Sequence, residues 1–418
     1  MTSLSVVRLT VAVSLLSLGG GSVCAAQGDV DQDGISDNVE RVLLDRFRPY
    51  YRFSRDNGDG ETFRPTDVMT YLGLSDIEGT SDEGDHVLVP NSTLAAAPNT
   101  LLSLRSNDHD RFCRAEQRPQ DCASSILLRA HQTEFYINPN NDEGRRGAVW
   151  PRVRWARNTG LYGHVVPVRL SSAEAYDYRQ VPASADAGRL YYKIEYWQFF
   201  GYSSNNKPLD LFDHEGDWDT VQLIYWPGNM AIGSRGQLMS VLYYAHGKEM
   251  RFDLSDSTGS VFMEGGAVKE LRGSNYNKPV PDLSEDGAEA AARNHVLRLF
   301  RDPVSGEYGH PVVFIEHGGH EFWPSPFWSY TGAQKHGGDD IEPFLTSSAP
   351  NLGEVEHPLG ETPAALPILQ FNGFWGTYSR GLSDLGHPNN PPPGPPLHFQ
   401  WSWPSSSSIR WQLVGLTP

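Results

Sequence analysis

Two acidic segments of this sequence carry groups that could bind a divalent cation. In the first, "DVDQDGISDNVE", oxygen donors recur at the spacing of a twelve-residue calcium loop. The donors are five carboxylates and one backbone carbonyl, which belong to Asp29, Asp31, Asp33, Ile35, Asp37 and Glu40. Gly34 permits the sharp turn of such a loop, and Glu40 can close the site with both oxygens. A solvated acidic linker is the alternative, but it would not explain this glycine and this glutamate in register. The segment therefore predicts a structural Ca²⁺ site.

The second acidic segment, "FDHEGDWDTV" at residues 212–221, runs directly into an apolar stretch. In an extended strand, Asp217 and Asp219 share a face with Val221, and Trp218 lies on the opposite face. Carboxylates at the rim of a core need a cation, an arginine or several N–H donors. A histidine among carboxylates suits Ca²⁺ or Mg²⁺ better than Zn²⁺. The candidate metal ligands are His214, Asp217, Asp219, Asp213 and Asp210. A solvated turn paired with an arginine is the alternative.

Two histidines at expected strand ends could serve a metal-dependent reaction. His246 ends a strand in "YYAHG", and His320 follows the paired glycines of "EHGGHEFWP", where the backbone can approach closely. Either imidazole could act as a general acid or base beside a metal-bound water. A purely structural histidine is the alternative in each case. The sequence contains no Gly-x-Ser-x-Gly, no phosphate-binding Gly-Lys-Ser/Thr and no His-Glu-x-x-His motif.

The elements that must position these residues are expected to be mostly strands. Aromatic and β-branched residues dominate segments 160–170, 189–200, 217–226, 238–246 and 310–318. A helix is expected after the calcium loop, capped by Asp37, with Val39, Leu43 and Phe47 on one face. A second helix is expected over 284–300. The sequence thus predicts a mainly β protein: an antiparallel β-sandwich with long loops, few helices and a short N-terminal calcium loop-helix.

The net charge argues against one class of partner. The formal net charge is −17, and the cations form only short pairs such as Arg145–Arg146. Binding to nucleic-acid phosphates relies on clustered lysine and arginine, so we expect no nucleic-acid partner. An acidic protein with carboxylate-rich loops is better suited to divalent cations.

The N-terminus is typical of a secreted protein. Arg8 and the apolar "LTVAVSLLSL" predict a signal peptide over 1–26, and this run is too short for a membrane anchor, the weaker alternative. We expect an extracellular protein, or a periplasmic one in a Gram-negative source. Its two remaining cysteines, Cys113 and Cys122, are expected to form a disulfide. The further expected parts are a calcium-binding loop and helix start over 27–43, a β-sandwich domain over 44–404 and a C-terminal tail over 405–418.

Five segments, in this order, resemble the vacuolar protein sorting-associated protein 62 family. They are "RFRPYYRFSRDNGDGETFRPTDVMTYL", "YWQFFGY", "FDHEGDWDTVQL", "HPVVFIEHGGHEFWP" and "FWGTYSRG". The resemblance covers most of residues 44–403 and leaves the calcium loop outside it. It does not imply a particular activity.

The His-x-Gly-Asp-Trp-Asp pattern at 214–219 is also similar to the Gly-His-Arg-His-Asp-Trp-Glu heptapeptide of the necrosis- and ethylene-inducing-like proteins. Those proteins are secreted β-sandwich cytolysins, whose motif binds a divalent metal and serves binding to membrane glycolipids. By position, the resemblance implies His214, Asp217 and Asp219 as metal ligands here. Asp219 replaces a glutamate, and the upstream aspartate of that family has no counterpart at matching spacing, so the resemblance does not carry cytolytic activity over.

Together these patterns predict a secreted protein that binds its ligand through a divalent metal. The expected ligand is a glycan or a lipid head group, with peripheral contact to membranes. The expected metals are Ca²⁺ in the N-terminal loop and Ca²⁺ or Mg²⁺ in the central cluster. One alternative is a metal-dependent hydrolase with a metal-activated water. The other is a non-catalytic protein whose acidic cluster is purely structural. The sequence leaves the oligomeric state open.

Overall fold

A computed structural model describes residues 28–54, 65–81, 84–98, 134–139, 160–169, 190–203, 214–228, 236–245, 248–253, 260–264, 267–272, 297–301, 308–316, 320–324, 341–345, 348–355, 357–371, 373–376, 394–398 and 401. Several predicted features lie outside these residues. They are the signal peptide, the C-terminal tail, the disulfide between Cys113 and Cys122, and the candidate residues Asp210, Asp213 and His246. Each of these stays a prediction.

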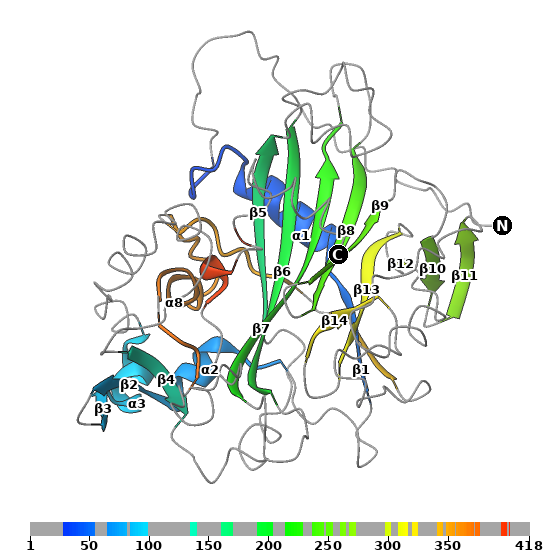
Figure 1. Cartoon of the computed structure of the whole chain (residues 1–418). Coiled ribbons are helices and arrows are strands. Elements are labelled where there is room, and N and C mark those ends of the chain that lie inside the picture. Colours follow the sequence, from blue (N-terminus) through cyan, green and yellow to red (C-terminus); the bar gives the residue numbers. More distant parts are fainter. Residues whose placement is uncertain are drawn as a thin grey trace, which may run out of the picture.

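The protein is mainly β with few helices, as its sequence predicts (Figure 1). Its longest strands form a five-stranded antiparallel sheet in the order β5-β6-β7-β8-β9. These strands are β5 (Leu161–Arg169), β6 (Leu190–Ser203), β7 (His214–Trp226), β8 (Gln237–Ala245) and β9 (Lys248–Asp253). Their aromatic and β-branched residues pack well on a pleated surface, which explains why the sequence predicts four of these strands. Strand β9 is not among the predicted strands.

A second sheet has the order β11-β10-β12-β13-β1-β15, and β14 pairs with β13. Its strands are β1 (Tyr50–Ser54), β10 (Ser260–Glu264), β11 (Ala267–Arg272), β12 (Leu297–Arg301), β13 (Tyr308–Ile315), β14 (Phe322–Trp323) and β15 (Ile341–Leu345). Two of its pairings are parallel, β1 with β13 and β10 with β12, so the expectation of an antiparallel arrangement is wrong for this sheet.

Strand β12 also corrects the helix expected over 284–300. Residues 297–301 are extended and pair with β10 on one side and β13 on the other, and residues 284–296 lie outside the described part of the chain. Hydrogen-bonding partners on both sides override the helical spacing of the apolar residues, which is a weak local preference.

A smaller third sheet, β3-β2-β4, is antiparallel and lies among short helices (Figure 1). These elements are α2 (Val68–Gly73), β2 (Ser75–Ser81), β3 (Gly84–Val89), α3 (Asn91–Ala96), β4 (Glu134–Pro139), α8 (Ala365–Gln370) and the 3₁₀ helix η6 (Pro395–Leu397). They share an aromatic core with β6 and β7, in which Trp218 packs 4.8 Å from Phe199 and 5.3 Å from Trp375 between ring centroids. No helix in the described ranges is long and apolar enough to cross a membrane.

The main hydrophobic core combines residues of the first two sheets and of helix α1 (Asp37–Phe47). On β7, Val221 and Leu223 face this core, whereas Trp218 belongs to the aromatic core on the other side. This confirms the alternation predicted for β7. Each such buried side chain stabilises the fold by about 1.5–3 kcal/mol. Burial of the apolar residues of β7 therefore determines toward which side of the sheet Asp217 and Asp219 point.

Helix α1 leads directly from the acidic loop into this core. Its N-cap is Ser36, whose Oγ accepts a hydrogen bond from the Val39 N–H at 3.4 Å, and not Asp37 as predicted, which is the first helical residue. The buried positions are Glu40, Leu43, Leu44 and Phe47. Val39 is 40 % exposed, so the predicted helical face is correct only in part. Helix α1 also spans the expected domain boundary between residues 43 and 44. Residues on both sides of this boundary belong to the main hydrophobic core.

Candidate metal centres

The acidic loop before α1 is folded by its own side chains. The Gly34 N–H donates to Asp29 Oδ2 at 3.2 Å, and the Ile35 N–H donates to Asp33 Oδ1 at 2.6 Å. The Val30 N–H donates to Asp37 Oδ1 at 2.9 Å. Gly34 has a φ of +95°, which glycine adopts readily and which the predicted sharp turn requires.

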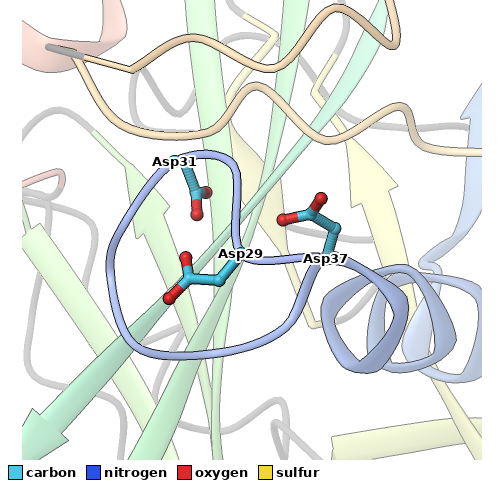
Figure 2. Close-up of side chains that lie close together, drawn as sticks. All are labelled: Asp29, Asp31 and Asp37. Carbon is cyan, nitrogen blue, oxygen red and sulfur yellow. The ribbon is translucent and has the colours of Figure 1, made fainter. Parts of the chain in front are cut away.

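The predicted loop carboxylates lie close together in two overlapping groups (Figure 2). Within each group the ligand oxygens all lie within 4.8 Å of one another. The groups are Asp29 with Asp31 and Asp37, and Asp31 with Asp33 and Glu40. Figure 2 shows the first group, in which Asp29 and Asp31 point into the ring of the loop and Asp37 lies beside it at the start of α1. Asp31 belongs to both groups, so the other four carboxylates lie around it.

Two of these carboxylates are buried without a partner. Asp31 is 1 % exposed and Glu40 is 0 % exposed, and in the described part of the chain none of their carboxylate oxygens has a hydrogen-bond partner. Burial, followed by neighbouring carboxylates, raises the pKa of Asp31 to about 6 and that of Glu40 to about 9. Burial also raises the pKa of Asp33 to about 7. Such groups are costly unless a cation or hydrogen-bond donors compensate their charge.

The donor set of the loop consists of oxygens, which suits a hard cation such as Ca²⁺. The structure therefore brings together the five side chains that the sequence predicts as ligands. Ile35 is 3 % exposed, and the role of its carbonyl stays a prediction, as does the identity of the cation.

The central cluster lies where β7 meets the chain that follows β13. Asp217 Oδ2 lies 3.1 Å from Nδ1 of His320, whose side chain is 0 % exposed. The imidazole of His320 stacks on Phe200 with 3.9 Å between ring centroids. His320 has a φ of +60°, which is uncommon for a residue with a side chain, and its N–H donates to the Glu316 carbonyl at 3.2 Å. A candidate general base is thus held next to a candidate metal ligand.

Asp219 lies on the same face and adds a second carboxylate. Its Oδ2 is buried and has no hydrogen-bond partner in the described ranges. Burial, then the charges of Asp217, Glu321 and Glu316, raise the pKa of Asp219 well above its usual range. Burial raises the pKa of Glu321 to about 7. Glu316 and Glu321 were not predicted as members of this cluster, although charged residues that follow a buried strand could have indicated them.

His214, the predicted histidine ligand, has one ring nitrogen bonded to its own backbone. Its Nδ1 lies 2.8 Å from the Gly216 carbonyl oxygen, so the ring bonds to the backbone of its own strand end. In the described part of the chain, the groups of three or more His, Cys, Asp or Glu side chains whose ligand atoms all lie within 4.8 Å of one another are the two in the N-terminal loop. His214, Asp217 and Asp219 do not form such a group. Asp217 contacts His320, and the charges of Glu316 and Glu321 act on Asp219.

A buried charged network was not anticipated from the sequence. Lys193 Nζ lies 2.7 Å from Glu195 Oε1, and His164 Nδ1 lies 2.7 Å from Glu195 Oε2. His164 Nε2 lies 3.1 Å from Glu354 Oε1. Burial alone would lower the pKa of His164, but its hydrogen bonds to Glu195 and Glu354 raise it to about 9. The sequence feature that could have indicated this network is the alternation of two charged residues, Lys193 and Glu195, within the aromatic strand "RLYYKIEYWQFF".

Comparisons with known proteins give no further assignment. No protein-family model, no curated protein and no solved structure matches this chain. The resemblance to the vacuolar protein sorting-associated protein 62 family therefore stays a prediction from motifs. The two candidate centres rest on the geometry of this chain alone.

Proposed function

We propose that this is a secreted, calcium-dependent binding protein, in which the loop of residues 29–40 holds a structural Ca²⁺ ion. The observation that carries the proposal is the pair Asp31 and Glu40, both buried and both without hydrogen-bond partners in the described ranges. A divalent cation would compensate these charges and those of the other loop carboxylates. The many oxygen ligands favour Ca²⁺ over Mg²⁺, which keeps several waters and uses fewer carboxylates.

The role proposed for this ion is to fasten the N-terminal loop and helix α1 to a β-sandwich formed by the first two sheets. The support is that α1 begins inside the ligand sequence, at Asp37 and Glu40, and buries Leu43, Leu44 and Phe47 in the main core. An ion that fixes Glu40 also fixes the first turns of α1. Binding should therefore stabilise the fold, by about 2.7 kcal/mol at a calcium concentration of 100 times the Kd.

Glu40→Gln is expected to weaken calcium binding at least 100-fold, which corresponds to ~2.7 kcal/mol, because it removes a ligand that can use both oxygens. The same change removes a carboxyl group whose ionisation is disfavoured by burial and by neighbouring Asp31 and Asp33. In excess chelator, the Tm of the variant should therefore equal or exceed that of the wild type. With calcium present, the order of the two Tm values should reverse. Isothermal titration calorimetry and thermal unfolding check both parts.

Asp45→Asn is the matched control on the same helix. The Asp45 carboxylate is 55 % exposed and lies 3.6 Å from Arg48, so its loss removes one charge without touching the loop. Its calcium affinity and Tm should be close to those of the wild type, because exposed ion pairs contribute little. A wild-type Tm that is the same in calcium and in chelator would contradict a structural calcium site.

The second part of the proposal concerns ligand binding, which we assign to the central cluster of Asp217, Asp219, His320 and Glu321. In support, Asp217 Oδ2 lies 3.1 Å from His320 Nδ1, and Asp219 Oδ2 is buried without a partner in the described ranges. A second divalent ion there could bridge the carboxylates to hydroxyl or phosphate oxygens of a glycan or a lipid head group. Asp219→Asn should abolish calcium-dependent retention on glycan arrays or anionic vesicles, while calorimetry still shows the N-terminal site. Retention that is unchanged by Asp219→Asn would contradict this assignment.

A metal-dependent hydrolase is the second candidate, favoured by the contact between His320 and Asp217 at 3.1 Å. A carboxylate that orients an imidazole is a common arrangement around a general base. However, the His320 side chain is 0 % exposed, so a substrate could not reach it without rearrangement. For this reason we place binding ahead of catalysis. Phosphoester or glycoside turnover that is lost both on chelation and in His320→Gln would reverse this order.

A further inference from the structure

The imidazole of His164 lies between two carboxylates. Its Nδ1 lies 2.7 Å from Glu195 Oε2, and its Nε2 lies 3.1 Å from Glu354 Oε1. Each Glu195 oxygen also accepts from a group that can only donate, Lys193 Nζ on Oε1 and Trp197 Nε1 on Oε2. Glu195 is therefore an ionised acceptor, and Glu354 is 25 % exposed, so water reaches its carboxylate. Both ring nitrogens of His164 donate, which makes the ring an imidazolium cation.

The carboxylate of Glu354 is held at this position by the backbone that precedes it. The Gly163 N–H of β5 donates to the Pro350 carbonyl, and the Leu352 N–H donates to the Gly163 carbonyl, both at 2.8 Å. This stretch therefore runs alongside β5, the strand that also carries His164. Glu354 follows two residues later, so the same contact sets its position opposite the imidazole.

Trp401, far downstream in the sequence, lies directly on this cation. Its indole and the His164 imidazole are stacked, with 3.8 Å between ring centroids and 4° between the ring planes. Lys193 Nζ donates to the Trp401 carbonyl at 2.5 Å. Tryptophan is the aromatic side chain whose ring face attracts cations most strongly. Two buried cations of the sheet therefore hold one downstream residue, the first by its ring and the second by its backbone.

Trp401 is one end of the η6 segment, which we define as residues 394–398 and 401. Its N–H donates to the His398 carbonyl at 3.0 Å, which ties it to the 3₁₀ helix η6. At the other end, a Cβ atom at Gly394 would lie 2.9 Å from Trp375 Nε1 and 3.0 Å from the Ile368 carbonyl oxygen, so this end packs closely on α8. One end of the segment is thus held by packing and the other by charged groups.

We propose that protonated His164 acts as a latch for the η6 segment, which stays docked on the sheet at Trp401 only while the imidazole carries both of its protons. Loss of one proton removes the charge that attracts the indole, together with one of the two N–H donors to the flanking carboxylates. Undocking also opens Lys193 to solvent, whose side chain is 1 % exposed when Trp401 is in place. The latch requires neither of the proposed metal ions.

The latch should open at alkaline pH. Burial lowers the pKa of His164, but hydrogen bonds to its two flanking carboxylates raise it to about 9, above the ordinary value of 6.5. The protonated ring therefore stabilises the docked state fully below pH 6.5, and this stabilisation is lost as the pH rises through about 9. The charged groups that surround the ring come from β6, from the 348–355 segment and from α1: Lys193, Glu195, Glu354 and Glu40.

The test is amide hydrogen exchange of the full chain, measured by mass spectrometry from about pH 7 to about pH 10 at one fixed calcium concentration. The reporters are the His398 and Trp401 N–H groups, whose acceptors are Pro395 and His398. After correction for the intrinsic pH dependence of exchange, their protection should fall about 10–30-fold as the pH passes about 9. Strand β6 should stay protected. Unchanged protection of the η6 segment, or an equal loss in β6, would overturn the inference.

His164→Gln identifies the group that titrates. Glutamine is uncharged at every pH, so the η6 segment of this variant should already be poorly protected at about pH 7, with no further change as the pH rises. A loss near pH 9 that persists in His164→Gln would assign the titration to another group, such as Lys193, and would overturn the inference.

His310→Gln is the matched control, because it replaces another buried histidine. His310 is 1 % exposed, as is His164, and its Nδ1 lies 2.7 Å from the Arg48 carbonyl oxygen. Its η6 segment should show the wild-type pH profile. Loss of that profile in His310→Gln as well would mean that general loosening of the fold is responsible, which would also overturn the inference.

Trp401→Leu is the second variant, in case His164→Gln does not fold. It keeps every charged group of the network and removes only the stacked indole, which is at the edge of its core with 9 % of the residue exposed. The η6 segment should then exchange rapidly at every pH, without a change near pH 9. A wild-type pH profile in Trp401→Leu would show that the stack does not hold the segment.

Discussion

Gly216→Ala is expected to destabilise the protein by at least ~3 kcal/mol, since it combines overpacking with an unfavourable left-handed backbone. A Cβ atom at this position would lie 1.6 Å from the Trp375 carbonyl oxygen, and the residue has a φ of +63°. The same carbonyl accepts a hydrogen bond from the Tyr71 hydroxyl at 2.9 Å, so it cannot withdraw freely. Urea denaturation followed by the fluorescence of the eleven tryptophans, which include Trp218 and Trp375, measures the loss.

Gly360→Ala is the control for that substitution. No heavy atom lies within 4 Å of a Cβ atom at Gly360, and its backbone is not in the left-handed region. The alanine variant should unfold within about 0.5 kcal/mol of the wild type, as most surface substitutions do. Similar unfolding midpoints for the two variants would show that the contact between Gly216 and Trp375 does not constrain the fold.

Glu195→Gln is expected to cost about 3–5 kcal/mol, because it leaves His164 and Lys193 buried with one anion fewer. Glu195 is 0 % exposed and also accepts hydrogen bonds from Gln222 and Trp197. The double variant Lys193→Met/Glu195→Gln removes one charge of each sign. It should lose less stability than Glu195→Gln alone, since replacing a whole buried pair is often tolerated.

Glu78→Gln provides the matched comparison for this network. Glu78 Oε1 accepts a hydrogen bond from Asn138 Nδ2 at 2.8 Å, and a glutamine can keep that bond. The free energy of unfolding of the Glu78→Gln variant should differ from that of the wild type by less than about 1 kcal/mol. If Glu195→Gln lost no more stability than Glu78→Gln, the side chains of the network would not carry the charges that we assign to them.

Local spacing was enough to predict part of this molecule. The alternation along β7 is confirmed, because period-two burial depends only on the strand itself. The loop carboxylates come together for a similar reason, since their convergence is set within twelve residues. Local spacing gave wrong predictions where contacts with other elements determine the structure. Val39 is exposed, and residues 297–301 form a strand between two others.

The central cluster was predictable only in part because its contacts are long-range. Asp217 and Asp219 were placed on the correct face, but their neighbours Glu316, His320 and Glu321 come from the connection between β13 and β14 of another sheet. The role of His214 as a ligand stays a prediction, and its Nδ1 lies 2.8 Å from the Gly216 carbonyl oxygen. Glu354 and His164 could not be paired from the sequence, because only the topology brings 350–352 against β5.

The strip of residues 350–352 has a consequence for the behaviour of the protein in solution. Strand β5 is the last strand of its sheet, and an open sheet edge can template pairing with another chain. Here the N–H and the carbonyl of Gly163, near one end of that edge, are already bonded to Pro350 and Leu352. This short length of chain therefore protects part of the edge from intermolecular strand addition and so from aggregation.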